Sequence, residues 1–175
     1  MFVVHARYRG RDKRRREIVE SSAEALSTLP GVRGFSASGV EDIQSQVEDA
    51  GAVTSVVMAL LSDGNWAIAI ACGQHAKDRA ARACGRRPMS VRVVGDEDVE
   101  AVFLLLAQVL GKRTPEGREA TSLVRRGMTQ NEAAGQLGIS KQAMSQRLQA
   151  AGWAAENAGW QLAVNLLELF RARCV

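Results

Sequence analysis

The sequence has no apolar run long enough to cross a bilayer. Its longest uncharged apolar stretch covers residues 50–62, well short of the ~20 residues that a membrane-spanning helix needs. The first residues also lack the charged start and the longer apolar segment of a secretory signal. We therefore expect a cytoplasmic protein that has no membrane partner.

Cysteine and histidine are also scarce. The 3 cysteines, Cys72, Cys84 and Cys174, are far apart and the 2 histidines stand alone, so no zinc-ligand spacing occurs. The expected state of the cysteines is that of reduced thiols or small core residues. The chain has no glycine-rich phosphate loop and no nucleophile–base pair that its spacing supports. We expect no metal, no cofactor and no enzymatic activity.

The composition is that of a globular protein with an uneven charge distribution. Apolar residues make up 46% and charged residues 24% of the 175 residues, enough for one sizeable domain or two small ones. Basic and acidic residues balance in residues 1–111. Residues 112–175 hold 9 basic and 5 acidic residues and so carry the whole net charge of +4. This asymmetry favours binding of a polyanion by the C-terminal part.

Hydrophobic periodicity predicts an α+β order in the first part of the chain and helices in the rest. Strands are expected over 1–8, 32–38, 43–47, 66–71 and 89–94, with helices over 12–29, 49–61, 77–84 and 99–110. The helix over 99–110 is apolar nearly all round, so it is either a core helix or a dimer contact. The boundary between two domains is expected at residues 111–117. This divides the chain into an α+β domain (1–111) and an all-helical domain (112–175).

The strongest local signal is a helix-turn-helix pattern over residues 128–148. Thr129 and Glu132 form a capping box for a first helix, and Gly138 falls where the chain must reverse. Ser140 caps a second helix that covers residues 141–151 and buries Met144 and Leu148. No Asp or Glu occurs between residues 141 and 155, which suits an approach to phosphates. The alternative is a plain corner between two packed helices.

The outward residues of the second helix carry amide, hydroxyl and amino groups, which are suited to base edges in a major groove. The predicted base contacts are Lys141, Gln142, Ser145, Gln146 and Gln149. The predicted phosphate contacts are Arg125, Arg126, Thr129, Gln130, Ser140 and Arg147. One small module makes few contacts, so we expect a homodimer that reads two half-sites about 34 Å apart.

A long helix over residues 156–173 carries two apolar stripes. Trp160, Ala163, Val164, Leu167 and Phe170 form the first, and Leu162, Leu166 and Leu169 form the second. Two stripes are more than one small bundle usually needs. The stripes therefore serve either self-association through this helix or simple packing in the core.

On these residues the chain resembles the SatD-like family of bacterial proteins, most closely its actinobacterial members. The resemblance is carried by residues 127–134, 137–148 and 150–153, and more loosely by residues 40–44 and 63–70. The resemblance implies a winged-helix or helix-turn-helix regulator that binds DNA. It implies no particular target sequence.

The N-terminal strand order is also similar to the ferredoxin-like core of nucleotidyl cyclases and palm polymerases. In those folds a carboxylate on the first strand and another at the hairpin hold divalent metals. Glu41 and Asp42 match the hairpin position, or else they form a solvated turn. The first strand offers Arg7 where an acid is expected, and a guanidinium cannot coordinate Mg²⁺. We therefore predict a degenerate, nucleotidyl-cyclase-like sheet without catalysis.

A basic run covers residues 7–16, with seven basic residues against Asp12 alone. Such runs are most often solvated, but this density also suits an anion, either a DNA phosphate or a nucleotide phosphate. The candidate anion contacts are Arg7, Arg9 and Arg11.

Together these patterns predict a sequence-specific, double-stranded-DNA-binding protein of the cytoplasm and nucleoid that regulates transcription. The N-terminal part would supply dimerisation or would sense a small-molecule or nucleotide effector. The main alternative is a nucleotide-binding sensor, or a degenerate nucleotidyl-transferase-like protein, with an accessory helix-turn-helix. A third is a protein-interaction adaptor that uses the Trp160 stripe.

Overall fold

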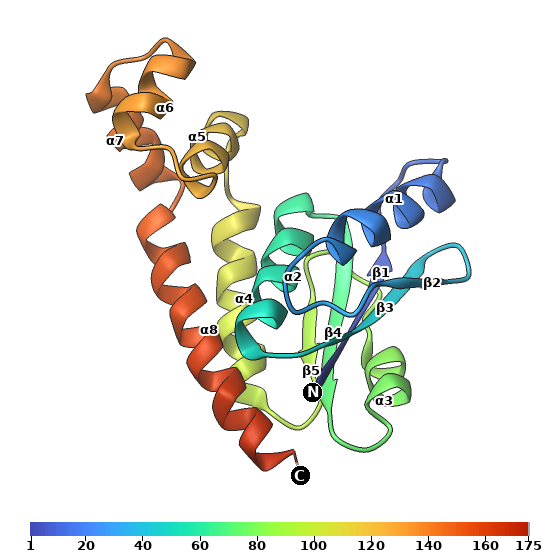
Figure 1. Ribbon diagram of the computed structural model, residues 1–175. Helices are drawn as coiled ribbons and strands as arrows, with labels where there is room; N and C mark the ends of the chain where they lie inside the picture. The colour runs from blue at the N-terminus through green and yellow to red at the C-terminus, as the bar shows by residue number, and fades with distance from the viewer. Residues whose placement is uncertain (175) are drawn as a thin grey trace.

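The computed structural model describes residues 1–174. Over these residues the chain is an α+β protein with one five-stranded mixed sheet and eight helices (Figure 1). The elements, in chain order, are β1 (Phe2–Tyr8), α1 (Arg15–Ser27), β2 (Ser36–Ser38), β3 (Asp42–Val47), α2 (Ala50–Asp63), β4 (Trp66–Cys72), α3 (Ala76–Ala83), β5 (Val91–Val93), α4 (Glu97–Gly111), α5 (Pro115–Arg125), α6 (Gln130–Leu137), α7 (Lys141–Ala150) and α8 (Trp153–Arg173). Within residues 1–174 no helix combines the length and the apolar composition that crossing a bilayer requires.

The strands lie in the order β2-β3-β1-β4-β5. The central strand β1 runs antiparallel to both β3 and β4, β2 runs antiparallel to β3, and β5 runs parallel to β4. The register of β1 and β3 pairs Arg7 with Asp42 and His5 with Gln44. Side chains of the predicted acidic turn are therefore held beside those of the first strand.

The two faces of the sheet differ in the size of their side chains, as β4 shows. Trp66, Ile68 and Ile70 face the larger core, to which α1, α2, α4 and α8 contribute. The alternate residues are alanines, and Ala69 belongs to a smaller cluster with Ala80 of α3 on the other face. Because side chains alternate along a strand, this sequence gives one thick apolar layer and one thin one. The small side chains let α3 lie close to the sheet.

The helix α8 joins the all-helical part of the chain to the sheet (Figure 1). Its residues Ala163, Leu167 and Phe170 are buried in the larger core, and the ring of Phe170 lies 6.3 Å from that of Phe2 on β1. The Trp160 stripe therefore packs within the chain. The second stripe is more open, since Leu162 and Leu169 are 49% and 62% exposed, so self-association through it stays a prediction.

The helix α4 takes the first of the two roles that its sequence left open, that of a core helix. Phe103 and Leu106 are buried in the larger core, whereas Leu104 and Leu105 are 41% and 67% exposed. It is therefore a core helix with one apolar side in contact with solvent. Whether that side forms a dimer contact stays a prediction.

Several element bounds differ from those that periodicity predicts. The strand expected over 32–38 is reduced to Ser36–Ser38, because Gly34 adopts a positive φ of 86° and interrupts the extended run. The last helix begins at Trp153 instead of residue 156, since Gly152 takes a left-handed conformation (φ 67°) and caps it. Both differences arise at a glycine, the residue for which this conformation costs least.

The cysteines were expected to be reduced thiols or small core residues; Cys72 is indeed buried in the larger core, but two of the three are paired instead of reduced. Cys72 at the end of β4 and Cys174 just after α8 form a disulfide with a Cα–Cα separation of 5.8 Å, within the usual range. They are 102 residues apart in sequence, so their spacing gave no sign of the pairing. Cys84 is a free, buried thiol, and its burial raises its pKa to about 11.

Candidate nucleic-acid interface

The helix α6 begins and ends where local chemistry favours it. The Thr129 hydroxyl oxygen accepts from the backbone N–H of Glu132 (3.3 Å), and the backbone N–H of Thr129 donates to the Glu132 carboxylate (2.8 Å). This capping box satisfies two N–H groups that the first turn leaves unpaired, and it lowers the pKa of Glu132. Gly138 ends the helix with a φ of 64° and turns the chain towards α7.

The helix α7 packs with α5 and α6 around a small core that is separate from the core of the sheet. The Ser140 hydroxyl oxygen accepts from the backbone N–H of Ala143 over 3.1 Å and so caps the helix. Met144 and Leu148 are buried against α5 and α6, where Ala133 and Ala134 leave room for close packing. The helices α6 and α7 extend beyond the sheet at the upper left of Figure 1. The inward side of α7 is thereby fixed, and its other side faces outwards.

The outward side of α7 is a row of exposed polar side chains. All five predicted base-contact residues are exposed: Lys141, Gln142, Ser145, Gln146 and Gln149. Among the hydrogen bonds and ion pairs of residues 1–174, none is made by these five side chains. Their donors and acceptors are therefore free for a partner molecule.

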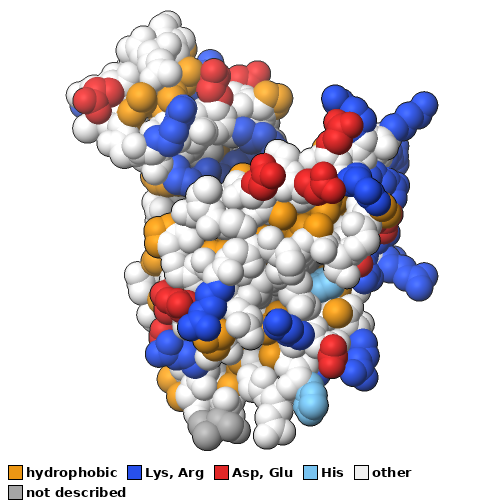
Figure 2. All heavy atoms as spheres, turned by 45° about the vertical axis from the view of Figure 1, so that its right-hand side comes forward, with side chains coloured by type: hydrophobic (Ala, Val, Ile, Leu, Met, Phe, Trp, Pro, Cys, Tyr) orange, Lys and Arg blue, Asp and Glu red, His pale blue; other side chains and the backbone are white. Residues whose placement is uncertain are grey.

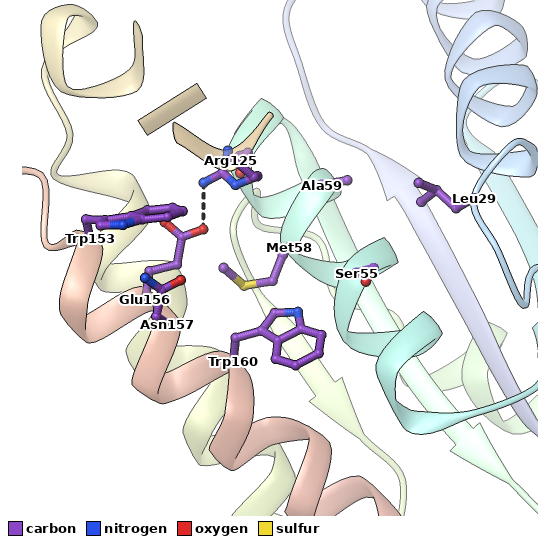
Figure 3. A pocket seen from close by; sticks show the side chains of 10 residues that line it. Leu29, Ser55, Met58, Ala59, Arg125, Trp153, Glu156, Asn157 and Trp160 are labelled. Carbon is purple, nitrogen blue, oxygen red and sulfur yellow. Dashed lines mark hydrogen bonds and ion pairs between the residues drawn. The ribbon is translucent and has the colours of Figure 1, made fainter. Parts of the chain in front are cut away.

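All six predicted phosphate-contact residues are at least partly exposed, but one of them is directed elsewhere. Arg126, Thr129, Gln130 and Ser140 are exposed, and Arg147 lies partly exposed in the last turn of α7. The Arg125 guanidinium instead turns towards α8, where it donates to the Glu156 carboxylate over 2.5 Å and lies 5.7 Å from the centre of the Trp153 ring (Figure 3).

Arg113 and Glu156 are residues that the sequence did not single out, and they position α7. Arg113 follows α4, and its guanidinium donates both to the Ala151 carbonyl oxygen (2.7 Å) and to the Glu156 carboxylate (2.5 Å). Ala151 directly follows α7. One buried side chain therefore fixes the end of α7 and the start of α8. In the sequence Arg113 stands beside Lys112 within the boundary segment 111–117, so no local signal marked it as a buried residue.

Both carboxylates of the predicted acidic turn form ion pairs with arginines. Asp42 accepts from the Nε atom of Arg7 over 2.6 Å, while Glu41 accepts from Arg9 over 2.6 Å and also pairs with Arg15. The hydrogen bond to Asp42 raises the pKa of Arg7. Two carboxylates that match a metal-binding position are thus neutralised by guanidinium groups from β1, from α1 and from the segment between them. A divalent cation there would have to displace these ion pairs.

The three candidate anion contacts differ in availability. Arg7 pairs with Asp42 and Arg9 pairs with Glu41, so of the three only Arg11 is an exposed residue. Figure 2 shows a cluster of Lys and Arg side chains at its upper right, near the start of α1. Within residues 1–174 the Nε atom of Arg9 is a buried polar atom without a hydrogen-bond partner.

No protein-family model and no curated protein matches this chain. Among solved structures, the chain is similar to the crystal structure of a regulator of polyketide synthase expression from Bifidobacterium adolescentis. The sequence identity is 15%, the TM-score is 0.29, and the match covers 98% of this chain and 80% of the other. A likeness this weak carries no argument about function, and the resemblance to the SatD-like family stays a prediction.

Proposed function

We propose that this protein binds double-stranded DNA in a sequence-specific manner and regulates transcription, with residues 141–151 lying in the major groove. The observation that carries the proposal is the outward row of α7, in which five exposed polar side chains have no partner within residues 1–174. Such a helix suits readout of base edges, because its apolar side is packed against α5 and α6 while its polar side has no partner within the part of the chain that the structure describes.

In this proposal residues 112–175 form a helix-turn-helix DNA-binding domain, in which α5, α6 and α7 make the DNA-binding part and α8 is the long C-terminal helix. Gln142 and Gln146 suit adenine, because an amide can donate to and accept from its major-groove edge, and Lys141 suits guanine. Ser145 and Gln149 complete the base-contact set. This assignment depends on side chains that are already exposed, so it requires no rearrangement of the helix core.

Phosphate groups would be held by Arg126, Thr129, Gln130, Ser140 and Arg147 at the border of the same surface. Arg125 is left out of this set, because its guanidinium is paired with Glu156 and lies over Trp153. The proposal thus assigns one of the two neighbouring arginines to DNA and the other to the protein.

We propose that the sheet, with its strand order β2-β3-β1-β4-β5, belongs to a ferredoxin-like domain that serves dimerisation or effector sensing. Two copies of α7 in a homodimer would read half-sites about 34 Å apart. The protein is not an enzyme in this proposal. A DNA-binding regulator is favoured over the nucleotide-sensor alternative, because Glu41 and Asp42 are already neutralised by arginines.

Selection from a random duplex pool with the full-length protein tests the proposal. We expect enrichment of a defined motif, and fluorescence anisotropy on that motif should show affinity that falls steeply between about 50 and 200 mM salt. A scrambled duplex should bind more weakly. No enrichment together with no salt-dependent retention of duplex would overturn DNA binding.

A further inference from the structure

A cleft of about 470 Å³ lies between α2 and the first turns of α8, beside the end of α5. Its volume is within the range of small-molecule sites. Figure 3 shows Met58 and Ala59 of α2 on one side of the cleft and Trp153, Asn157 and Trp160 of α8 on the other. The cleft is thus built from segments about 100 residues apart in sequence.

The walls of the cleft are mostly apolar and include two aromatic rings. Trp153 and Trp160 present indole rings, and Met58 adds a thioether that adapts its shape to a neighbouring ring. Both indoles are only partly buried, so the free protein leaves their apolar surface open to solvent. Surfaces of this kind favour a flat, apolar molecule that stacks against the rings.

One end of the cleft is positively charged. Arg113 and Arg125 both donate to Glu156, so two guanidinium groups share one carboxylate and a charge of +1 is left over. Arg113 is buried, whereas the Arg125 side chain is 43% exposed and lines the cleft. Within residues 1–174 a single hydrogen bond, to Glu156, is made by the Arg125 guanidinium. Its remaining donors are free to bind an anion.

We propose that this cleft binds a flat, apolar molecule bearing one acidic group, such as an aromatic carboxylic acid. The ring system lies between Met58 and the two indoles, and the carboxylate accepts hydrogen bonds from Arg125. This site is separate from the proposed DNA-binding row on α7. Its walls include the end of α5 and the start of α8, which both pack against α7, so the ligand lies at the junction of the helical module and the sheet.

Calorimetric titration of the full-length protein with 1-naphthoate tests the site. We expect saturable binding of one molecule per chain, at least about tenfold tighter than that of 1-naphthalenemethanol, which has the same rings without the charge. Arg125→Gln should remove this preference and leave the binding of the alcohol unchanged. Equal affinity for the two probes would overturn the role of Arg125.

Two filling variants test the location of the site from opposite walls. Ala59→Phe and Asn157→Phe replace exposed residues that line the cleft, and each should weaken 1-naphthoate binding at least about tenfold. Ala101→Phe, at an exposed position of α4 away from the cleft, should bind as the unaltered protein does. Unweakened binding by a folded filling variant, or no saturable binding by the unaltered protein, would overturn the proposal. Thermal melting identifies the folded variants, and either filling variant alone is decisive.

Discussion

Arg113 and Glu156 form a buried ion pair that joins the end of α4 to the first turn of α8, with 2.5 Å between the guanidinium and carboxylate atoms. Their side chains are only 3% and 6% exposed. A buried charge that loses its partner is costly, because the remaining ion can neither return to water nor be neutralised. This pair therefore sets the position of α7 relative to the sheet, since Arg113 also holds the carbonyl oxygen of Ala151.

We expect Glu156→Gln to lower the free energy of unfolding by about 3 kcal/mol, because Arg113 keeps a hydrogen-bond acceptor but loses its counter-charge. Urea denaturation measures the change. Glu48→Gln is the matched control: Glu48 pairs with Arg33, both side chains are 53% exposed, and such pairs contribute about 0–1 kcal/mol. Equal effects of the two substitutions would show that burial adds nothing to the Arg113–Glu156 pair.

The second prediction concerns the outward row of α7. Gln142→Ala and Gln146→Ala should each cost about 1–3 kcal/mol of binding to the selected duplex and should relax base preference at one position. Anisotropy with single-base variants of the duplex measures both effects. Gln161→Ala on α8 is the control, because Gln161 is also exposed but lies outside the α7 row. Selectivity that survives both α7 substitutions would remove this helix from base readout.

Arg125 and Arg126 are adjacent in sequence, yet we predict different effects on DNA binding. Arg126→Ala should weaken all duplexes alike and reduce the salt slope by about one, as expected for a lost phosphate contact. Arg125→Ala should leave the slope nearly unchanged, because its guanidinium is held beside Glu156 and Trp153 at the start of α8 instead of beside the α7 row. Titrations of a selected and a scrambled duplex at several salt concentrations measure the slopes. A larger slope change for Arg125→Ala would return that residue to the phosphate-contact set.

Gly152 should be sensitive to substitution. Its φ is 67°, and an added Cβ would lie 2.8 Å from the Cγ1 atom of Val109 on α4. We expect Gly152→Ala to lower the free energy of unfolding by about 1–2 kcal/mol from the backbone conformation alone, with the close contact adding to the loss. Gly135→Ala in α6 is the control, since nothing lies within 4 Å of its added Cβ. That change should be neutral or should stabilise the protein by up to about 1 kcal/mol.

Local signals predicted much of the fold. The capping box of Thr129 and Glu132 marks the start of α6, and Gly138 marks its end. Each signal depends only on residues close together in sequence, so the sequence alone identifies both ends of this helix. The uninterrupted apolar run over residues 66–71 likewise predicted a buried strand, and the structure has β4 there. Structural features that depend on residues close together in sequence could therefore be predicted.

Contacts between distant segments were not predictable from one sequence. Arg113 meets Glu156 across 43 residues, and Cys72 meets Cys174 across 102. In each case the residue type fits several roles, and only the folded chain, in which α8 packs on α4 and α2, selects one of them. For the same reason the sequence placed Arg125 beside Arg126 as a phosphate contact, whereas the fold turns it towards Trp153. The cleft between α2 and α8 exists only in the folded chain.

The final prediction concerns the pH dependence of stability. His5 on β1 is 4% exposed, and its burial lowers its pKa below the usual 6.5, although Asp42 at 3.3 Å acts in the opposite direction. A histidine with a lowered pKa in the folded state takes up a proton more readily when the chain is unfolded. Its contribution to stability is therefore fully present above pH 6.5 and is lost as the pH falls through the folded-state pKa.

We expect the free energy of unfolding to fall between pH 7 and pH 5, with His5 contributing at most about 1.4 kcal/mol per pH unit. His5→Gln should reduce this fall, because glutamine does not titrate and its amide can still hydrogen-bond in place of the ring. Urea denaturation at several pH values measures the slope, and His75→Gln, at an exposed position, should leave the slope as it is. A steeper fall for His5→Gln than for the unaltered protein would mean that the attraction of Asp42 outweighs burial and that the proton on His5 stabilises the fold.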